Sequence, residues 1–99
     1  MAIQRRIHFT WLVLILSSAC GSPAPGDGKA LFEKNCKLCH GTDGKKMMGG
    51  APDLSISALS REENIQVILN GRGTMPPFAH ALSAEDAGAV ADYIARMRP

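Results

Sequence analysis

The pattern of apolar and polar positions divides the chain into an apolar N-terminal stretch and three segments with helical periodicity. Residues 7–16 are mostly apolar, and beyond residue 26 apolar side chains recur at intervals of three and four. Helices are predicted from Gly28 to Asn35, between Ser60 and Gly71, and from Ser83 to Met97. No run alternates between apolar and polar residues, so no strand is predicted. The pattern therefore predicts an all-α fold.

Each predicted helix begins at a polar residue that can cap it. Asp27 precedes the first helix, and Ser60-Arg-Glu-Glu63 and Ser83-Ala-Glu-Asp86 have the spacing of capping boxes. The predicted apolar faces contain, in turn, Leu31 and Phe32; Ile65, Ile68 and Leu69; and Val90, Tyr93, Ile94 and Met97. The loops over 41–55 and 71–82 are rich in Gly and Pro. They are too long for a packed bundle unless something fills the middle.

The N-terminal stretch has the parts of a secretory signal peptide. Arg5 and Arg6 precede the apolar residues 7–16, and the small residues 17–19 follow. An uncleaved anchor is the alternative, but about ten to thirteen apolar residues rise less than ~20 Å as a helix, short of the ~30 Å hydrocarbon core. We therefore expect residues 1–19 to be a signal peptide that is cleaved after Ala19. The chain's formal net charge of +2 excludes a basic footprint for nucleic acid.

Cys20 follows the predicted cleavage point. The run Leu16-Ser-Ser-Ala-Cys20-Gly21 resembles a bacterial lipobox, although Ser17 stands where Leu is most common. The resemblance implies a lipid anchor on Cys20 and, because Gly21 follows, sorting to the outer membrane in a Gram-negative host. An ordinary signal peptidase that leaves Cys20 as a free thiol is the alternative. Residues 20–26 contain Pro and Gly at most positions and are predicted to be a tether.

The segment Cys36-Lys-Leu-Cys39-His40 indicates what fills the middle of the fold. Cysteines three apart place both sulfurs on one side of a helical turn, where they can add to the two vinyl groups of one haem. His40 can then bind the iron from the same side. This spacing is the attachment signature of c-type haem. Removal of residues 1–19 would leave 80 of the 99 residues, and a chain of that size with few aromatic side chains usually needs a bound cofactor, a metal or a disulfide to fold firmly.

Three other interpretations of the two cysteines are less well supported. A zinc site needs two more ligands, and the sequence offers no second cysteine pair and only His80 as a further candidate. A thioredoxin-like dithiol requires a βαβ context, which is not predicted. A structural disulfide would leave His40 without a role.

Residues 27–99 resemble a class I cytochrome c over nearly their whole length. Gly28 and Phe32, which precede Cys36 by eight and four residues, match the N-terminal helix of that family, and Val90 and Tyr93 match the C-terminal helix that crosses it. The resemblance implies the cytochrome c fold, with three main helices and loops wrapped around one covalently bound haem c.

The resemblance also implies a second axial ligand on a glycine-rich loop followed by proline. Gly71-Arg-Gly-Thr-Met75-Pro matches that pattern, so His40 and Met75 are the expected axial ligands of the iron. His80 is the rival ligand, whereas Met47 and Met48 are expected to pack at the haem edge or to be exposed. Arg72 has two interpretations, a partner of a haem propionate or an exposed loop arginine.

Ala51-Pro52-Asp53-Leu54 resembles the Gly-Pro-x-Leu segment of the family. The resemblance implies that the Pro52 carbonyl accepts a hydrogen bond from Nδ1–H of His40 and orients the imidazole. It also implies that Leu54 packs on the haem face. An ordinary loop proline is the alternative for Pro52.

These features predict an electron carrier rather than an enzyme. His/Met ligation leaves the iron six-coordinate in both oxidation states, and the thioether favours Fe(II). We expect a small exported cytochrome c on the periplasmic side, held to a membrane through Cys20, with redox proteins as donor and acceptor. An electron-input haem subunit of a larger dehydrogenase or reductase is one alternative. A gas-binding or catalytic haem, which needs an open sixth position, is the other.

Overall fold

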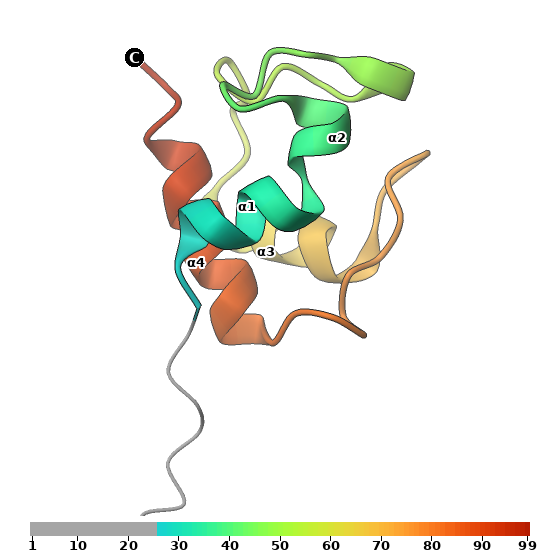
Figure 1. Cartoon of the computed structure of the whole chain (residues 1–99), viewed down its shortest axis with the longest axis vertical. Coiled ribbons are helices and arrows are strands. Elements are labelled where there is room, and N and C mark those ends of the chain that lie inside the picture. The colour runs from blue at the N-terminus through green and yellow to red at the C-terminus, as the bar shows by residue number, and fades with distance from the viewer. Residues whose placement is uncertain (1–25) are drawn as a thin grey trace, which may run out of the picture.

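The computed structural model describes residues 26–99, which form helices joined by loops (Figure 1). The helices are α1 (Gly28–Asn35), α2 (Lys37–His40), the short 3-10 helix η1 (Met48–Gly50), α3 (Arg61–Asn70) and α4 (Ala84–Ala95). Residues 26–99 contain no sheet, and an isolated bridge between Arg72 and Met75 is the one sheet-like pairing among them. The predicted all-α class with three main helices is confirmed.

The predicted capping residues begin the three longer helices. Asp27 accepts a hydrogen bond at 3.0 Å from the backbone amide two residues further on. Ser60 and Glu63 form a complete capping box at the start of α3, and Ser83 and Asp86 form one at the start of α4. These side chains bind backbone amides that the first turn of a helix leaves without partners.

A kink at Cys36 separates α1 from α2. Cys36 has φ −116° and ψ −28°, and its amide still donates to the Phe32 carbonyl at 2.8 Å. The chain then begins the single turn of α2, which runs in a different direction from α1 (Figure 1). The apolar pattern predicted the helix up to Asn35 but did not predict this second, shorter helix.

The core forms where α4 packs against both α1 and α3. The rings of Phe32 in α1 and Tyr93 in α4 meet edge to face, with centroids 5.3 Å apart and planes at 61°. Phe32 and Val90 are fully buried. Gly28 lies so close to α4 that a Cβ there would overlap the carbonyl of Ala89. The crossing of the first and last helices therefore uses the four residues on which the family resemblance rested.

The end of α4 differs from the predicted one. The helix ends at Ala95, so Met97 does not lie on its core face as the periodicity suggested. Beyond the helix the chain tightens into a 3-10-like turn. The amide of Arg96 donates to the carbonyl of Tyr93 at 3.1 Å, and the amide of Met97 donates to the carbonyl of Ile94 at 3.0 Å. Met97 is half-buried there and still packs against the core.

Part of the predicted organisation falls outside the described residues. The signal peptide over 1–19, Cys20 and all of the tether except Gly26 precede them. Within residues 26–99, none of the helices combines the length and the apolar character that a membrane crossing requires.

Candidate functional site

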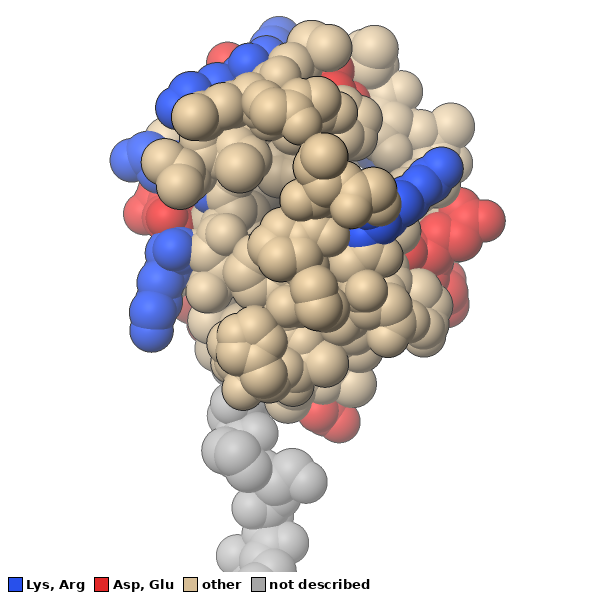
Figure 2. All heavy atoms as spheres, turned by 90° about the vertical axis from the view of Figure 1, so that its right-hand side faces the viewer, with Lys and Arg blue, Asp and Glu red and all other residues tan. Residues whose placement is uncertain are grey.

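A cleft of about 1080 Å³ opens among the described residues. Its volume slightly exceeds the range of about 300–1,000 Å³ that is usual for ligand pockets. The loops that follow α2 and α3 form much of its wall, and the face shown in Figure 2 is hollowed and largely free of charged side chains. All six residues predicted to bind the haem line this one cleft: Cys36, Cys39, His40, Pro52, Leu54 and Met75.

The two cysteines are carried to the cleft by the kink between α1 and α2. Cys36 is buried at the kink, Cys39 is exposed within α2, and both are free thiols. Burial and, to a smaller extent, the neighbouring Cys39 together raise the pKa of the Cys36 thiol to about 11. Cys36 is therefore a neutral thiol near pH 7.

His40 ends α2 with its side chain buried. Burial lowers the pKa of His40, and the backbone carbonyl of Pro52 raises it by a smaller amount. The lowered pKa favours the neutral imidazole, which is the form that binds a metal. Nδ1 of His40 is buried without a hydrogen bond of good geometry to any described residue. The Pro52 carbonyl is thus near enough to raise the pKa of His40, but it does not accept a hydrogen bond of good geometry from Nδ1 of His40.

The loop after α2 folds back through residues with positive φ. Gly41 (φ 75°), Gly44 (φ 78°) and Met47 (φ 55°) adopt this conformation, which is uncommon for a side chain such as that of Met47. The amide of Leu54 donates to the carbonyl of Gly44 at 2.9 Å and closes the loop. Leu54 is thereby buried in the wall of the cleft, beside Pro52.

The second loop brings Met75 to the cleft. Gly71 has φ 74°, and a Cβ there would lie 2.6 Å from the carbonyl oxygen of Met75, so the turn requires glycine. Arg72 and Met75 exchange two backbone hydrogen bonds, at 3.1 and 3.0 Å. The amide of Phe78 donates to the carbonyl of Ile68 at 2.9 Å and fastens the end of the loop to α3. Met75 is half-buried between these two attachments.

The alternative ligands occupy different positions. His80 is exposed and does not line the cleft, whereas Met47 and Met48 line it but are 57% and 49% exposed. Among residues 26–99, no three His, Cys, Asp or Glu side chains gather around a point where a metal ion could bind. The apolar cleft, the paired thiols, the imidazole and the thioether fit a covalently attached haem.

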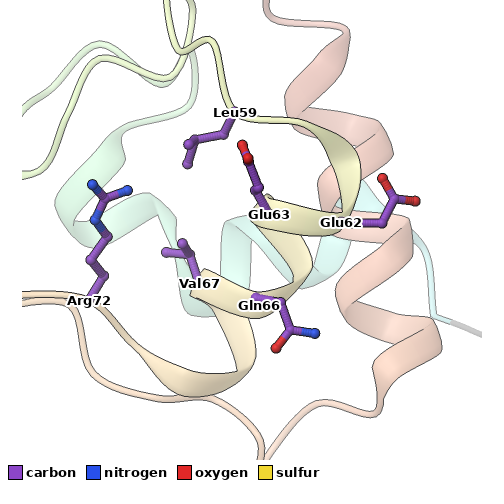
Figure 3. Close-up of a pocket in the computed structure, with 6 residues that line it drawn as sticks. All are labelled: Leu59, Glu62, Glu63, Gln66, Val67 and Arg72. Atoms are coloured by element: carbon purple, nitrogen blue, oxygen red, sulfur yellow. The ribbon is translucent and has the colours of Figure 1, made fainter.

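The structure adds a second, shallower pocket of about 430 Å³. Figure 3 shows Arg72 at one side of it and Glu63 at another, with Leu59 and Val67 between them. Arg72 also lines the large cleft and forms no ion pair with a described residue. Arg72 is exposed and lines the cleft, so its position fits both a partner of a haem propionate and an exposed loop arginine.

Two residues of the cleft were missed by the sequence analysis. Asn64 is a buried polar residue in the cleft wall, on the face of α3 that also carries Val67 and Ile68. Its spacing of three and four residues from those apolar positions is a signal that could have identified it. Thr74 donates a hydrogen bond at 3.0 Å to the carbonyl of Gly49, which joins the two loops that border the cleft. No local pattern predicts that bond.

Comparisons with known proteins identify the family to which this chain belongs. The family model described as "Cytochrome C oxidase, cbb3-type, subunit III" matches residues 23–94. Cytochrome c6 of Microcystis aeruginosa is 38% identical over 74 residues, which cover 69% of this chain and 90% of that protein. Cytochrome c55X of Pseudomonas aeruginosa is 35% identical over an alignment of 103 positions, which covers 88% of this chain and 84% of that protein.

A solved structure extends the comparison to the fold. The crystal structure of cytochrome c6C from Synechococcus sp. PCC 7002 superposes with a TM-score of 0.62 at 26% identity, covering 72% of this chain and 93% of that one. The family model spans most of the described residues, and the two relatives are matched over most of their own lengths. This chain therefore belongs to the monohaem class I c-type cytochromes, small electron-transfer proteins that hold haem c covalently.

Proposed function

We propose that this protein is an exported one-electron carrier in which His40 and Met75 bind the haem iron from opposite sides. The observation that carries the proposal is the meeting of Cys36, Cys39, His40 and Met75 in one apolar cleft, although Met75 comes from a separate loop. When bound, the haem supplies an Fe(III)/Fe(II) couple. The chain's part is to hold that group, to supply both axial ligands and to limit the access of water.

Each residue of the cleft has a distinct role in this proposal. Cys36 and Cys39 fix the cofactor through thioether bonds. The Pro52 carbonyl orients His40, and its smaller, raising effect on the His40 pKa supports this role. Leu54 covers the haem face with an apolar side chain.

The rim of the cleft offers a surface for redox partners. Leu38 and Ile56 line the cleft and yet are 73% and 77% exposed, and Met47 and Met48, which line the same cleft, are exposed as well. Large apolar side chains exposed together are typical of protein–protein contact sites. This rim supports brief docking of a donor and an acceptor protein at the haem edge.

An electron-input subunit of a larger complex is a second candidate. It is favoured by the description of the matching family, which names an oxidase subunit. Purification from solubilised membranes separates the two candidates, because a subunit remains with stoichiometric partners whereas a free carrier elutes alone. A gas-binding haem requires an open coordination position, and the placement of Met75 in the cleft disfavours it.

The covalent attachment is tested by extraction of the purified protein with acid and acetone. The pigment should stay with the polypeptide, and a variant with both Cys36→Ala and Cys39→Ala should lose it. Pigment that moves into the organic phase from the native protein would exclude thioether attachment.

Met75→Ala tests the axial ligand. The variant should keep its covalent haem, lose the long-wavelength sulfur-to-iron absorption of the ferric state, and have a lower midpoint potential because the ligand that favours Fe(II) is gone. The ferrous form should bind carbon monoxide readily, whereas the native protein should bind it poorly. Met47→Ala and Met48→Ala are the matched controls and should show none of these changes. Persistence of the absorption in Met75→Ala would mean that another residue is the ligand.

We further infer that residues 1–19 direct export, that residues 20–26 tether the protein, and that residues 27–99 are the cytochrome domain. The lipobox-like run before Gly21 supports a lipid on Cys20, which would hold the protein at a membrane on the periplasmic side. Cys20→Ser should then move the haem protein from the membrane fraction to the soluble exported fraction. A native protein that is soluble and begins with an unmodified Cys20 would disprove the anchor.

A further inference from the structure

Asn64 is a buried polar residue in a largely apolar wall. The residue is 6% exposed and lines the haem cleft. Val67 and Ile68, three and four residues further along α3, line the same cleft, so the three side chains share one face of the helix. The carboxamide of Asn64 therefore stands at a position where an apolar side chain would complete the wall.

The carboxamide forms no hydrogen bond to another described residue. The backbone amide of Asn64 donates to the carbonyl of Ser60 at 2.9 Å, as the helix requires. The other helical asparagines differ, because the Asn35 amide donates to the Leu31 carbonyl at 2.9 Å and the Asn70 amide donates to Gln66 at 3.0 Å. Asn64 is not among the fully buried polar groups that lack a partner, so its carboxamide reaches the open space of the cleft. A group that fills the cleft displaces water from this amide and has to supply a hydrogen-bond partner in its place.

The chemistry of haem leaves one strong acceptor for this amide. In a c-type site the four pyrrole nitrogens bind the iron and the two vinyl groups are used by Cys36 and Cys39. The propionate carboxylates remain, and a hydrogen bond to an ionised carboxylate is stronger than one between neutral groups. We propose that Nδ2 of Asn64 donates a hydrogen bond to a haem propionate. This inference rests on the haem binding proposed above and assigns to Asn64 a role that the sequence pattern did not indicate.

Few charged groups surround this carboxylate. Arg72 and Asp53 are the charged residues that line the cleft among residues 26–99, together with the titratable Cys36, Cys39 and His40. The cysteines and His40 are used by attachment and ligation. Arg72 can pair with one propionate while Asn64 binds the other. A propionate held ionised near the iron favours Fe(III), so Asn64 acts as a positioning residue that sets how the midpoint potential depends on pH.

The test measures the midpoint potential of the holoprotein as a function of pH. Asn64→Leu keeps the size of the side chain and removes the donor. We expect the pH range over which the potential changes to move upward by about one unit, which is a tenfold change in the proton affinity of the propionate. Asn64→Gln, which keeps a donor, should restore most of the native profile. Asn35→Leu is the matched control, because it removes a cleft-lining amide that already has a backbone partner.

Each outcome supports or overturns the proposal. A native pH profile in Asn64→Leu would show that water satisfies the amide and would overturn it. Loss of the sulfur-to-iron absorption in Asn64→Leu would also overturn it, because Asn64 would then act on Met75. An upward shift in Asn64→Leu with native behaviour in Asn35→Leu supports it. Failure of haem attachment appears earlier, in the extraction of the native protein, and is therefore distinguishable from failure of this inference.

Discussion

Single residues decide how closely the backbones of the fold approach. Gly28 allows α1 to lie directly on the Ala89 carbonyl of α4, and Gly71 allows the turn that carries Met75. At each position a Cβ would meet backbone atoms, which cannot move aside as the end of a side chain can. Thr74 acts through a side-chain hydrogen bond. Its hydroxyl donates to the carbonyl of Gly49 and so links the loop that carries Met75 to the loop that follows α2.

Gly28→Ala should destabilise the holoprotein. The added methyl group overlaps the Ala89 carbonyl, so the two helices must separate. We expect a loss of about 1–3 kcal/mol in the free energy of unfolding, measured by thermal or denaturant unfolding of the ferric form. Gly26→Ala is the control, because its Cβ would meet the movable end of the Leu31 side chain at 2.9 Å. Equal stability of the two variants would contradict the proposed close contact of α1 and α4.

Thr74→Val should loosen the loop that carries Met75. The substitution keeps the shape of the side chain and removes the hydrogen bond to Gly49. The net contribution of one hydrogen bond is about 0.5–1.5 kcal/mol. Its loss should make the open form of the loop about two- to tenfold more populated. Cyanide should therefore bind the ferric iron faster by that factor in stopped-flow measurements. Thr74→Ser should behave like the native protein. Thr42→Val, in the other loop, should have no effect, and an equal acceleration there would refute a specific role for Thr74.

At the scale of elements, caps and short links hold the helices in place. Asp86 belongs to the capping box of α4 and also accepts a hydrogen bond at 2.8 Å from the amide of Gly26, just before α1. One carboxylate thus ties the start of the described chain to the start of its last helix. Arg61 at the start of α3 pairs with Asp92 of α4 at 2.8 Å, but both side chains are about half exposed, so this pair contributes little.

The contribution of Asp86 to stability should disappear in acid. The amides of Gly26 and Ser83 lower the pKa of Asp86 below its ordinary value of 3.8. Because this pKa is lower in the folded state than in the unfolded state, ionised Asp86 stabilises the fold fully at pH values above its unfolded-state pKa. This stabilisation is lost as the pH falls through the folded-state pKa. Asp86→Asn should therefore melt at a lower temperature than the native protein near pH 6, and the difference should shrink below about pH 4. A difference that stays constant between pH 6 and pH 3 would contradict this assignment.

At the scale of the whole molecule, the described residues form a thin core beside a large cleft. The buried cluster consists mainly of small and medium side chains around Phe32, and the cleft of about 1080 Å³ separates much of it from the loops. A domain of this size buries little apolar surface by itself, so the cofactor has to supply part of the core. The order of the loops therefore depends on the group that they enclose.

The polypeptide without haem should be largely unfolded. The variant with Cys36→Ala and Cys39→Ala, expressed without residues 1–19, should give a proton NMR spectrum with little dispersion and weak helical circular dichroism. The holoprotein with the native cysteines is the reference and should give well-dispersed signals. A well-dispersed spectrum from the haem-free variant would show that the described core is sufficient on its own.

The sequence by itself determined the local features of this protein. Caps such as Ser60 and Ser83, the spacing of Cys36, Cys39 and His40, and the glycine and proline that flank Met75 all act within a few residues. Backbone geometry at that range follows from the residues themselves, so these features could be read without the fold. The signal peptide and the lipid on Cys20 remain predictions from the sequence, because these residues precede the described ones.

The tertiary structure decided the features that depend on residues far apart in the chain. The kink at Cys36 and the end of α4 before Met97 depart from the local helical pattern, which tertiary context commonly overrides. The position of Asn64 in the cleft and the bond from Thr74 to Gly49 exist because two loops close over the same space. The chain determines which residues can bind a haem, whereas the way its loops close determines which other groups face it.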